Sequence, residues 1–530
     1  MRVLFRLLGL RGVDQRFATF ENLALSSEPK IVFGAIGKLA LIPSTVSLPK
    51  PTARTRAMTR LTESDVSSNL ELMSIGELLQ FFTDGGDAEE TVAFEEFEAN
   101  ALACANELAR RCLERELQRR EDALPEKFYR PEALGQDEGH FVREGRAGGT
   151  YHSLCGPLRI QRYRYRGWGE SLVGIEICEG LIAKMTPALA RSLAHGYANQ
   201  PVRRFREDLV AAHRRPPSRA TMERAAKKVS SLLLGDDLLQ QIREKEILDN
   251  EVTGIVLGLD RTSVPMAEYK RNQPPIERKK PRVRKAPPPV AVNWRMDYVG
   301  TVSYVNKHGE SLYKRSYRES YRSTGNAIAD NMVRDVEQAL KQNQALTIAI
   351  VQDGAPELWT LLRKRLKPIV PKPVEILDWY HASERLSDCL ELCVSNTEKR
   401  REMRKRWQTN LLEKKDGAAR FIRSLRRYLK KLRKSGDHDG ETRLREHLNY
   451  FAKRRAQLCY LMATKRGLPI GSGVTEGTCK SLVAQRAKRS GQRWRPYGLG
   501  MALGVRALRQ SDRFQAAWDN KPASCLVPCP

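Results

Sequence analysis

The 530-residue chain has no apolar run of membrane-spanning length. Its start, MRVLFRLLGLRG, makes a poor signal peptide, because an Arg interrupts the apolar stretch and no small-residue cleavage site follows. The ten cysteines are scattered and form no C-x-x-C pair, which argues against a disulfide framework and against a zinc ribbon. We therefore expect a cytoplasmic protein with reduced thiols and no membrane partner.

Nucleotide-binding motifs are also missing, since the sequence holds neither a Walker motif nor a dinucleotide-binding motif. Acidic residues are few beside basic ones, with 63 Asp and Glu against 92 Lys and Arg and a formal net charge of +29. Such an excess favours a polyanionic partner, most commonly nucleic acid, although charge alone does not exclude a merely soluble basic enzyme. The length predicts about two to four domains.

Changes of pattern divide the N-terminal part of the chain. Residues 1–57 lack periodicity, so we interpret them as an extension that is disordered or precedes the true start codon. Residues 87–123 predict a long amphipathic helix, acidic first and Arg-rich later, within an N-terminal helical region at 58–135. Residues 140–167 alternate in short runs around Gly turns and predict a small antiparallel sheet or hairpin within a β region at 136–182.

A third region, residues 183–250, is predicted to be helical. Its sequence favours three consecutive helices at 186–199, 201–213 and 218–234. Short helices with a basic third member fit a helix-turn-helix DNA-binding region. A plain helical bundle fits the same pattern equally well.

Strands alternate with helices over residues 251–381, which predicts a sheet with a parallel portion. The interval 382–467 predicts a basic helical insertion, since residues 401–460 hold 19 Lys and Arg against 7 Asp and Glu. A final helical region at 468–510 and a short, uninformative tail at 511–530 follow. The predicted elements of the core are a strand from 254 that ends in Asp260, an exposed basic loop at 270–290, strands at 291–305, 311–318, 346–353 and 373–380, and helices at 326–341 and 356–366.

Two acids end predicted buried strands of this core, Asp260 and Asp353. In open α/β sheets, sites form outside the carboxyl ends of the strands. Two carboxylates there repel each other unless a cation lies between them, and Mg²⁺ and Mn²⁺ prefer carboxylate oxygens. Gly354 lets the chain turn sharply and is expected to admit a phosphate close to the backbone.

Glu476 is the best candidate for a third carboxylate. Gly471 and Gly473 keep the approach open, and Ser472 can cap a helix that carries Glu476 in its first turn. Lys480 lies one turn further on the same face and could meet a phosphate. The basic residues and the aromatic residue that follow suit contact with a nucleic-acid backbone and base stacking; they are Arg486, Lys488, Arg489, Arg493 and Trp494.

Each of these acids also has a simpler interpretation, since an Asp at a strand end is more commonly a turn or cap residue. Asp378 and His381 are spaced to share a helix face; they could support a metal site, or Asp378 could simply cap the helix. Cys389 and Cys393 are expected to be core residues. Four further acids are not excluded by spacing alone, namely Asp297, Asp330, Glu357 and Glu375.

Four stretches together resemble the DDE transposases of bacterial insertion sequences, specifically the ISKra family. They are LGLDRTSVPM, VQDGAPELW, LDWYHASERL and LPIGSGVTEGTCKSLVAQRAKRSGQRW, and the resemblance covers about residues 58–510. The basic tract at 270–290 looks longer than such a core requires, and residues 1–57 have no recognised counterpart.

The resemblance implies an α/β fold with an RNase H-like catalytic domain, a mixed sheet with flanking helices, and a helical insertion before the final acid. It implies that Asp260, Asp353 and Glu476 form a catalytic triad that binds two Mg²⁺ or Mn²⁺ ions. Two such ions, about 3.5–4 Å apart, stabilise the attacking and leaving oxygens of an in-line phosphoryl displacement. The pair Asp378 and His381 resembles a D-x-x-H motif of several DDE groups and would organise the site.

The leading interpretation is therefore a transposase. Its N-terminal helical and small-sheet region would recognise terminal inverted repeats in double-stranded DNA, and the need to bring two ends together implies a homodimer or a larger assembly on DNA. A nuclease of the same fold without strand transfer is one alternative. A catalytically silent, transposase-derived DNA-binding protein is another.

Overall fold

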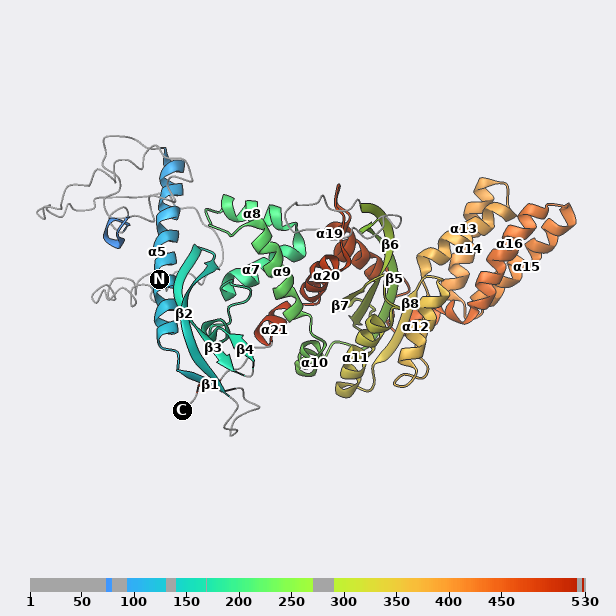
Figure 1. Ribbon diagram of the computed structural model, residues 1–530. Helices are drawn as coiled ribbons and strands as arrows, with labels where there is room; N and C mark the ends of the chain where they lie inside the picture. Colours follow the sequence, from blue (N-terminus) through green and yellow to red (C-terminus); the bar gives the residue numbers. More distant parts are fainter. Residues whose placement is uncertain are drawn as a thin grey trace, which may run out of the picture. The chain divides into compact units, whose positions relative to one another are not determined.

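The computed structural model describes residues 73–78, 93–129, 140–167, 169–269, 290–521 and 527–528. Residues 1–57 and all but the last residue of the basic loop at 270–290 lie outside the described residues. Within them, the chain forms two five-stranded sheets and many helices (Figure 1). The described helices include none that combines the length and the apolar character needed to cross a membrane.

The first sheet is antiparallel throughout, in the order β10-β1-β2-β3-β4. The predicted small sheet or hairpin is present, with two long antiparallel strands, β2 and β3, in place of short runs around Gly turns. Gly149 lies inside β2, where the Arg162 side chain of β3 occupies the space a Cβ would need. The tail is not uninformative, because it supplies β10. The strands are β1 (Lys127–Tyr129), β2 (His140–Ser153), β3 (Gly156–Gly167), β4 (Glu170–Leu172) and β10 (Val527–Pro528).

Helix α5 (Phe94–Asp122) runs beside β3 and covers its open edge. Glu114 and Gln118 accept hydrogen bonds from alternate backbone N–H groups of β3, at 2.7 Å from Arg159 and 2.8 Å from Gln161. Polar side chains on one helix face thus replace a missing strand and keep the edge from pairing elsewhere. The part of the predicted helix before Ala93 lies outside the described residues.

The three helices predicted between 183 and 250 are present, and α10 was not predicted. They do not form a core of their own. Leu193 of α7 and Ala226 of α9 belong to the same apolar cluster as Val505 and Trp518 near the C-terminus. This shared core is what a helical bundle requires, and the DNA-binding role stays a prediction. The elements are α6 (Gly174–Cys178), α7 (Pro187–Asn199), α8 (Val202–Ala211), α9 (Arg219–Leu233), α10 (Asp236–Lys245), α20 (Pro496–Gln510) and α21 (Phe514–Asp519).

The second sheet is mixed, in the order β7-β6-β5-β8-β9, with antiparallel pairing from β7 to β5 and parallel pairing from β5 to β9. Helices α11 and α12 pack on one face, and α13 (Trp379–Cys393) and α17 (Tyr460–Lys465) share an apolar cluster with residues of β5, β6, β8 and β9 on the other. This mixed α/β arrangement is consistent with the expected RNase H-like fold. The elements are β5 (Gly254–Tyr269), β6 (Val290–Val305), β7 (Ser311–Glu319), α11 (Asn326–Gln342), β8 (Thr347–Gln352), α12 (Pro356–Leu366) and β9 (Val374–Leu377).

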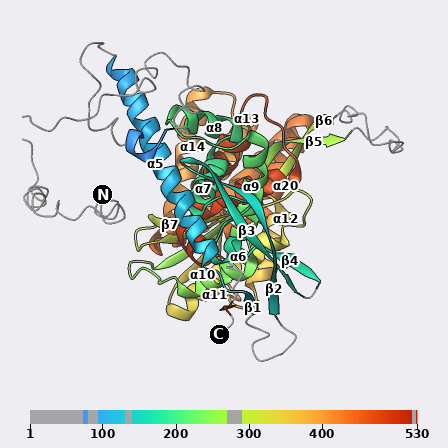
Figure 2. The ribbon, with the colours of Figure 1, turned by 60° about the vertical axis from the view of Figure 1, so that its left-hand side comes forward.

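Two predicted strand ends are wrong. Strand β5 does not end at Asp260; it continues to Tyr269 because β6 pairs with it along its whole length. Beyond the last parallel pair with β8, at Leu257, and beyond the reach of β7, the two form a ribbon that extends past the other strands (Figure 2). Strand β9 ends at Leu377, because Asp378 caps the next helix by accepting a hydrogen bond from the His381 backbone N–H.

The predicted insertion is helical, and Cys389 is buried in its core as expected, with Cys393 packed against the same cluster. Its helices are α13 (Trp379–Cys393), α14 (Thr397–Glu413), α15 (Gly417–Ser435), α16 (His438–Lys453), η4 (Arg455–Gln457) and α17 (Tyr460–Lys465). The helix predicted over SGVTEGTCKSLVAQRAKRSGQRW, residues 472–494, is shorter in the structure and ends at Ala487. It consists of α18 (Gly473–Thr478), a π-helical turn η5 (Cys479–Ala484) and α19 (Gln485–Ala487).

Candidate metal centre

One pocket brings together the three acids singled out from the sequence. Asp260 lies in β5, Asp353 directly follows β8, and Glu476 lies in α18. All three line this pocket, and so does His381 of α13; the remaining lining residues are Leu259, Val351, Gln352, Ser472 and Thr475. Residues more than 200 positions apart in the sequence thus meet at the carboxyl edge of the parallel strands, where the sequence places the site.

Close packing of α18 against the sheet explains how Glu476 reaches this edge. A Cβ at Gly258 of β5 would overlap the Thr475 hydroxyl. The Thr475 hydroxyl in turn lies 2.6 Å from that of Thr301 on β6. A Gly inside a buried strand often marks such a close approach, and this signal was not used in the sequence-based interpretation.

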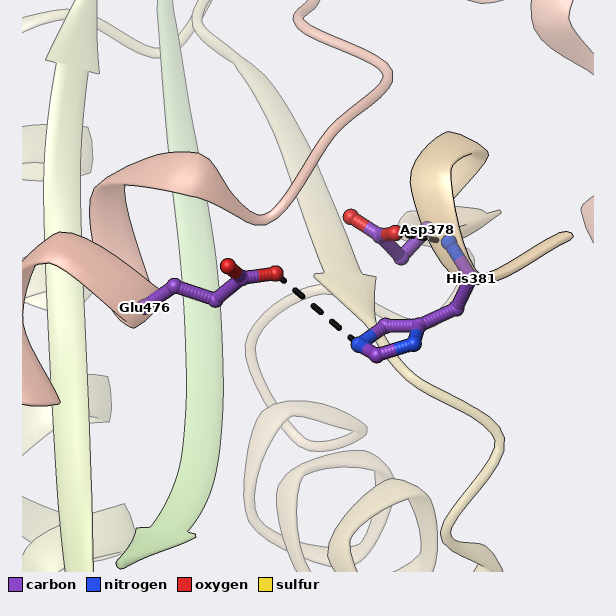
Figure 3. A group of neighbouring side chains, drawn as sticks. All are labelled: Asp378, His381 and Glu476. Atoms are coloured by element: carbon purple, nitrogen blue, oxygen red, sulfur yellow. Dashed lines mark hydrogen bonds and ion pairs between the residues drawn. The ribbon is translucent and has the colours of Figure 1, made fainter. Parts of the chain in front are cut away.

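Asp378 links the two sides of the pocket. Its carboxylate is buried; Oδ1 accepts a hydrogen bond from the His381 backbone N–H at 2.8 Å and Oδ2 accepts one from the Ser472 backbone N–H. The second bond holds the loop that leads into α18. Figure 3 shows His381 facing Glu476, with Nε2 3.8 Å from Oε1. This geometry suits the site-organising role that the sequence suggested for Asp378 and His381.

A second grouping of metal-binding atoms overlaps with the predicted one. One ligand atom each from Asp378, His381 and Glu476 lies within 4.8 Å of the other two. Each Asp378 oxygen already accepts one backbone N–H group, which orients the carboxylate within this grouping. Glu476, whose side chain is 40% exposed, belongs to both groupings.

The three pocket acids have no Lys or Arg ion-pair partner among the described residues. Asp260 accepts hydrogen bonds from the Arg261 backbone N–H at 2.6 Å and from the Cys479 thiol at 3.4 Å. Burial raises the pKa of Asp260; these two hydrogen bonds oppose the rise, and the charges of Asp353 and Glu476 add to it. Like charges therefore raise the pKa of Asp260 further, and no ion pair to a described Lys or Arg offsets them.

The four alternative acids differ in this respect, because each forms an ion pair with an arginine. Asp297 is fully buried and also accepts a hydrogen bond from the Tyr321 backbone N–H at 2.9 Å. Paired carboxylates of this kind are structural, so the geometry separates them from the pocket acids. The pairs are Asp297 with Arg318, Asp330 with Arg365, Glu357 with Arg261, and Glu375 with Arg363.

The candidate DNA-contacting residues differ in how exposed their side chains are. Lys480, Arg489 and Arg493 are exposed. Lys488 donates a hydrogen bond at 2.8 Å to Thr262, two residues after Asp260 on β5, and so lies near the pocket.

Two members of the predicted set are structural. Arg486 is 1% exposed, and its guanidinium donates hydrogen bonds to the Tyr197 and Gln200 carbonyls of the helical region. Trp494 lies beneath that guanidinium, 4.5 Å from ring centroid to Cζ, and its indole N–H donates to the Ala487 carbonyl. Burial leaves the Arg486 side chain unavailable to a phosphate, and the partly buried Trp494 ring packs against that guanidinium.

Gly354 also differs from expectation. The space beside it is not open to a phosphate, because a Cβ there would overlap the hydroxyl and ring of Tyr450 from α16. The Gly is needed for this protein contact.

Comparisons with known proteins give little. No family model matches the chain, and no curated protein matches it significantly. Among solved structures, the chain is similar to the Drosophila P element transposase strand transfer complex, at 11% sequence identity and a TM-score of 0.23, over 64% of this chain and 81% of that one. A likeness at this TM-score carries no argument about the fold or the activity of this chain.

Proposed function

We propose that the protein is a metal-dependent DNA transposase of the DDE type, from a bacterial insertion sequence of the ISKra family. One observation carries the proposal: Asp260, Asp353 and Glu476 share one pocket and form no ion pair with a described Lys or Arg, in a chain of net charge +29. Three clustered acids without a Lys or Arg partner among the described residues are suited to hold a cation, with His381 beside Glu476.

The donor set of the pocket fits Mg²⁺ or Mn²⁺. Asp260, Asp353 and Glu476 offer carboxylate oxygens, which these hard cations prefer, and their mutual repulsion falls when a divalent ion binds. When bound, the ions would activate a water or a DNA 3′-hydroxyl and stabilise the departing oxygen.

The chain's own groups hold these acids in place. The Ser472 hydroxyl lies 3.3 Å from Glu476 Oε1 and can donate to it, while Asp378 fixes the backbone of Ser472. The Cys479 thiol orients Asp260 from the same helical segment. These contacts keep the carboxylates in place when no ion is bound.

The surrounding regions take the roles that the family resemblance implies. The mixed sheet would be the RNase H-like catalytic core, with residues 382–467 as its insertion and residues 58–250 as the part that recognises terminal inverted repeats. Lys480, Lys488, Arg489 and Arg493 would contact the DNA backbone. Two transposon ends would be held by a homodimer or a larger assembly.

The proposal is tested with labelled DNA from the two flanks of the gene, incubated with the full-length protein in Mg²⁺ or Mn²⁺. The Asp353→Asn variant keeps the side-chain shape and removes the charge. We expect the wild type to cut and join this DNA, and the variant to bind it without cutting. Glu357→Gln is the matched control, since Glu357 lies at the same sheet edge but pairs with Arg261; it should cut normally.

Each outcome has a distinct meaning. Equal cutting by Asp353→Asn and wild type would show that Asp353 is a turn residue and that the proposed triad is wrong. Cutting without joining in the wild type would identify a nuclease of the same fold. Binding without any cutting, in either metal, would identify a silent DNA-binding protein.

A further inference from the structure

A cluster of one tyrosine and two arginines lies beside the loop that carries Asp353. Tyr450 of α16 packs directly against Gly354, as described above. The guanidinium carbons of Arg385 and Arg454 each lie 4.1 Å from the centroid of the Tyr450 ring. We call Arg385, Tyr450 and Arg454 the Arg–Tyr cluster. It belongs entirely to the helical insertion, yet it contacts the catalytic edge of the sheet.

The cluster is held in a fixed position relative to the pocket. Arg454 donates hydrogen bonds to the Gly354 carbonyl and, at 3.2 Å, to the Tyr450 carbonyl. Arg385 lies one helical turn after His381 on α13, so the two side chains share a face of that helix. Polar side chains on one face of α13 therefore extend from His381 in the pocket to Arg385 in the cluster.

The cluster presents hydrogen-bond donors that form no ion pair with a described acid. Neither arginine forms an ion pair within the part of the chain that the structure describes, although Asp388 lies one turn from Arg385. No described residue hydrogen-bonds with the Tyr450 hydroxyl. Arg385 is exposed, so its guanidinium is open to a ligand.

The chemistry of these donors selects a phosphate. The planar guanidinium group matches the geometry of phosphate oxygens, and hydrogen bonds between charged partners are the stronger ones. Two guanidinium groups already lie over the Tyr450 ring, which argues against base stacking on that ring.

We propose that the Arg–Tyr cluster binds a backbone phosphate of the substrate strand, next to the phosphodiester that is cut. This inference rests on the proposed function, because it assigns the ligand of the same site. Arg385 and the Tyr450 hydroxyl donate to the phosphate, and Arg454 holds the Asp353 loop against them. The insertion then positions the strand as well as adding basic charge.

The first test measures binding by the full-length Asp353→Asn protein of a short fluorescein-labelled duplex of mixed sequence over a range of salt concentrations. Arg385→Gln should reduce the slope of log affinity against log salt by about 1, the value for one lost phosphate contact. Arg404→Gln on α14 is the matched control, since Arg404 is exposed and lies outside the cluster. A slope for Arg385→Gln equal to that of the control would overturn the proposal.

The second test measures cutting at saturating DNA with an intact Asp353. A misplaced strand slows the chemical step, so Arg385→Gln should reduce the rate by about tenfold to a hundredfold. Tyr450→Phe keeps the ring packing and removes only the hydroxyl; we expect a smaller loss in the same direction. Thermal unfolding of each variant checks that the fold is retained, and unchanged rates in both folded variants would contradict the assignment.

Two further outcomes distinguish this proposal from the proposed function and from binding of a free anion. If Asp353→Asn cuts as well as wild type, the proposed function fails, while the salt slopes still report on the cluster. Inorganic phosphate at constant ionic strength should not displace the duplex. Displacement that Arg385→Gln abolishes would identify a site for a free anion and would overturn the assignment to DNA.

Discussion

Two clusters of charged groups in this protein differ in whether their carboxylates are paired with arginine. Asp335 of α11 is fully buried, and its Oδ1 lies 2.9 Å from both Arg243 and Arg513, while Tyr317 donates to Oδ2. This network joins α10, α11, β7 and the start of α21. In the pocket, by contrast, Asp260, Asp353 and Glu476 lie together without any such cation in the described chain. Arginine is abundant, so its absence from the pocket leaves room for a cation from solution.

The pKa shifts follow the same division. Burial pushes the pKa of Asp335 upward, but Arg513 and Arg243 outweigh it, and the net pKa is lowered. For Asp260, burial and the neighbouring acids prevail, and the net pKa is raised. Ionised Asp335 therefore stabilises the folded protein, whereas ionised Asp260 destabilises it.

The largest effect should come from removing one acid from each cluster and measuring denaturant unfolding without metal. Asp335→Ala leaves Arg243 buried without its ion-pair partner and leaves Arg513 paired with Glu246 alone, and we expect a loss of about 3–5 kcal/mol in the free energy of unfolding. Asp353→Ala removes like-charge repulsion and should change stability by no more than about 0.5 kcal/mol. Equal losses in the two variants would show that both clusters are structural.

A second contrast concerns the glycines that set the position of Glu476. A Cβ at Gly258 would overlap Thr475, so Gly258→Ala should cost about 1–3 kcal/mol by overpacking. It should also reduce cutting by displacing α18. Gly477 of α18 has nothing within 4 Å of a Cβ, and Gly477→Ala should stabilise the helix by about 0.5–1 kcal/mol. Normal cutting by Gly258→Ala would show that Glu476 does not depend on this packing.

Local sequence signals predicted much of the sheet and its helices. Helix α12 has the predicted bounds, because Pro356 suits a first helical position and the apolar residues that follow recur at helical spacing. The sequence predicts that strand β5 ends at Asp260, whereas the strand continues to Tyr269. It continues because β6, which begins at the end of the basic loop, pairs with it. Pairing with a distant strand leaves no local trace in the sequence.

The residues of the candidate site also differ in whether the sequence could predict them. Acids at strand ends could be chosen from the sequence, since strand position and motif resemblance both depend on nearby residues. The burial of Arg486 could not be predicted from the sequence. Its hydrogen-bond acceptors are carbonyls of α7 and of the residue that caps α7, nearly 290 positions earlier. Tyr450 was missed for the same reason, since its contact with Gly354 joins the insertion to the sheet.

A third prediction tests whether the pocket takes up a cation. An ion that binds only the folded protein raises the free energy of unfolding by about 1.4 kcal/mol at ten times its dissociation constant. We expect this rise for wild type in Mn²⁺ and its loss in Glu476→Gln. The control Glu357→Gln should keep it, because that acid is already paired. A rise of equal size in Glu476→Gln would place the ion elsewhere.

The smallest effect, and the sharpest in sign, is the pH dependence of stability in metal-free protein. A carboxyl group whose pKa is raised by folding binds a proton more readily in the folded state, so its charge costs stability above that pKa. The cost disappears below the unfolded pKa, near about 3.9. Asp260→Asn should therefore be more stable than wild type near neutral pH, and the difference should shrink as the pH falls towards about 4.

Asp335 provides the opposite sign within the same molecule. Its lowered pKa gives a contribution to stability that is complete above the unfolded value and is lost only as the pH falls through the folded one. The stability deficit of Asp335→Asn should therefore stay constant between about pH 7 and pH 5, whereas the advantage of Asp260→Asn should decline as the pH falls towards the unfolded value. Chemical unfolding of wild type and both variants at each pH measures the two differences. A constant advantage for Asp260→Asn, or a deficit, would mean that its carboxylate is compensated by a group within the protein, and the pocket would then have no need of a metal ion.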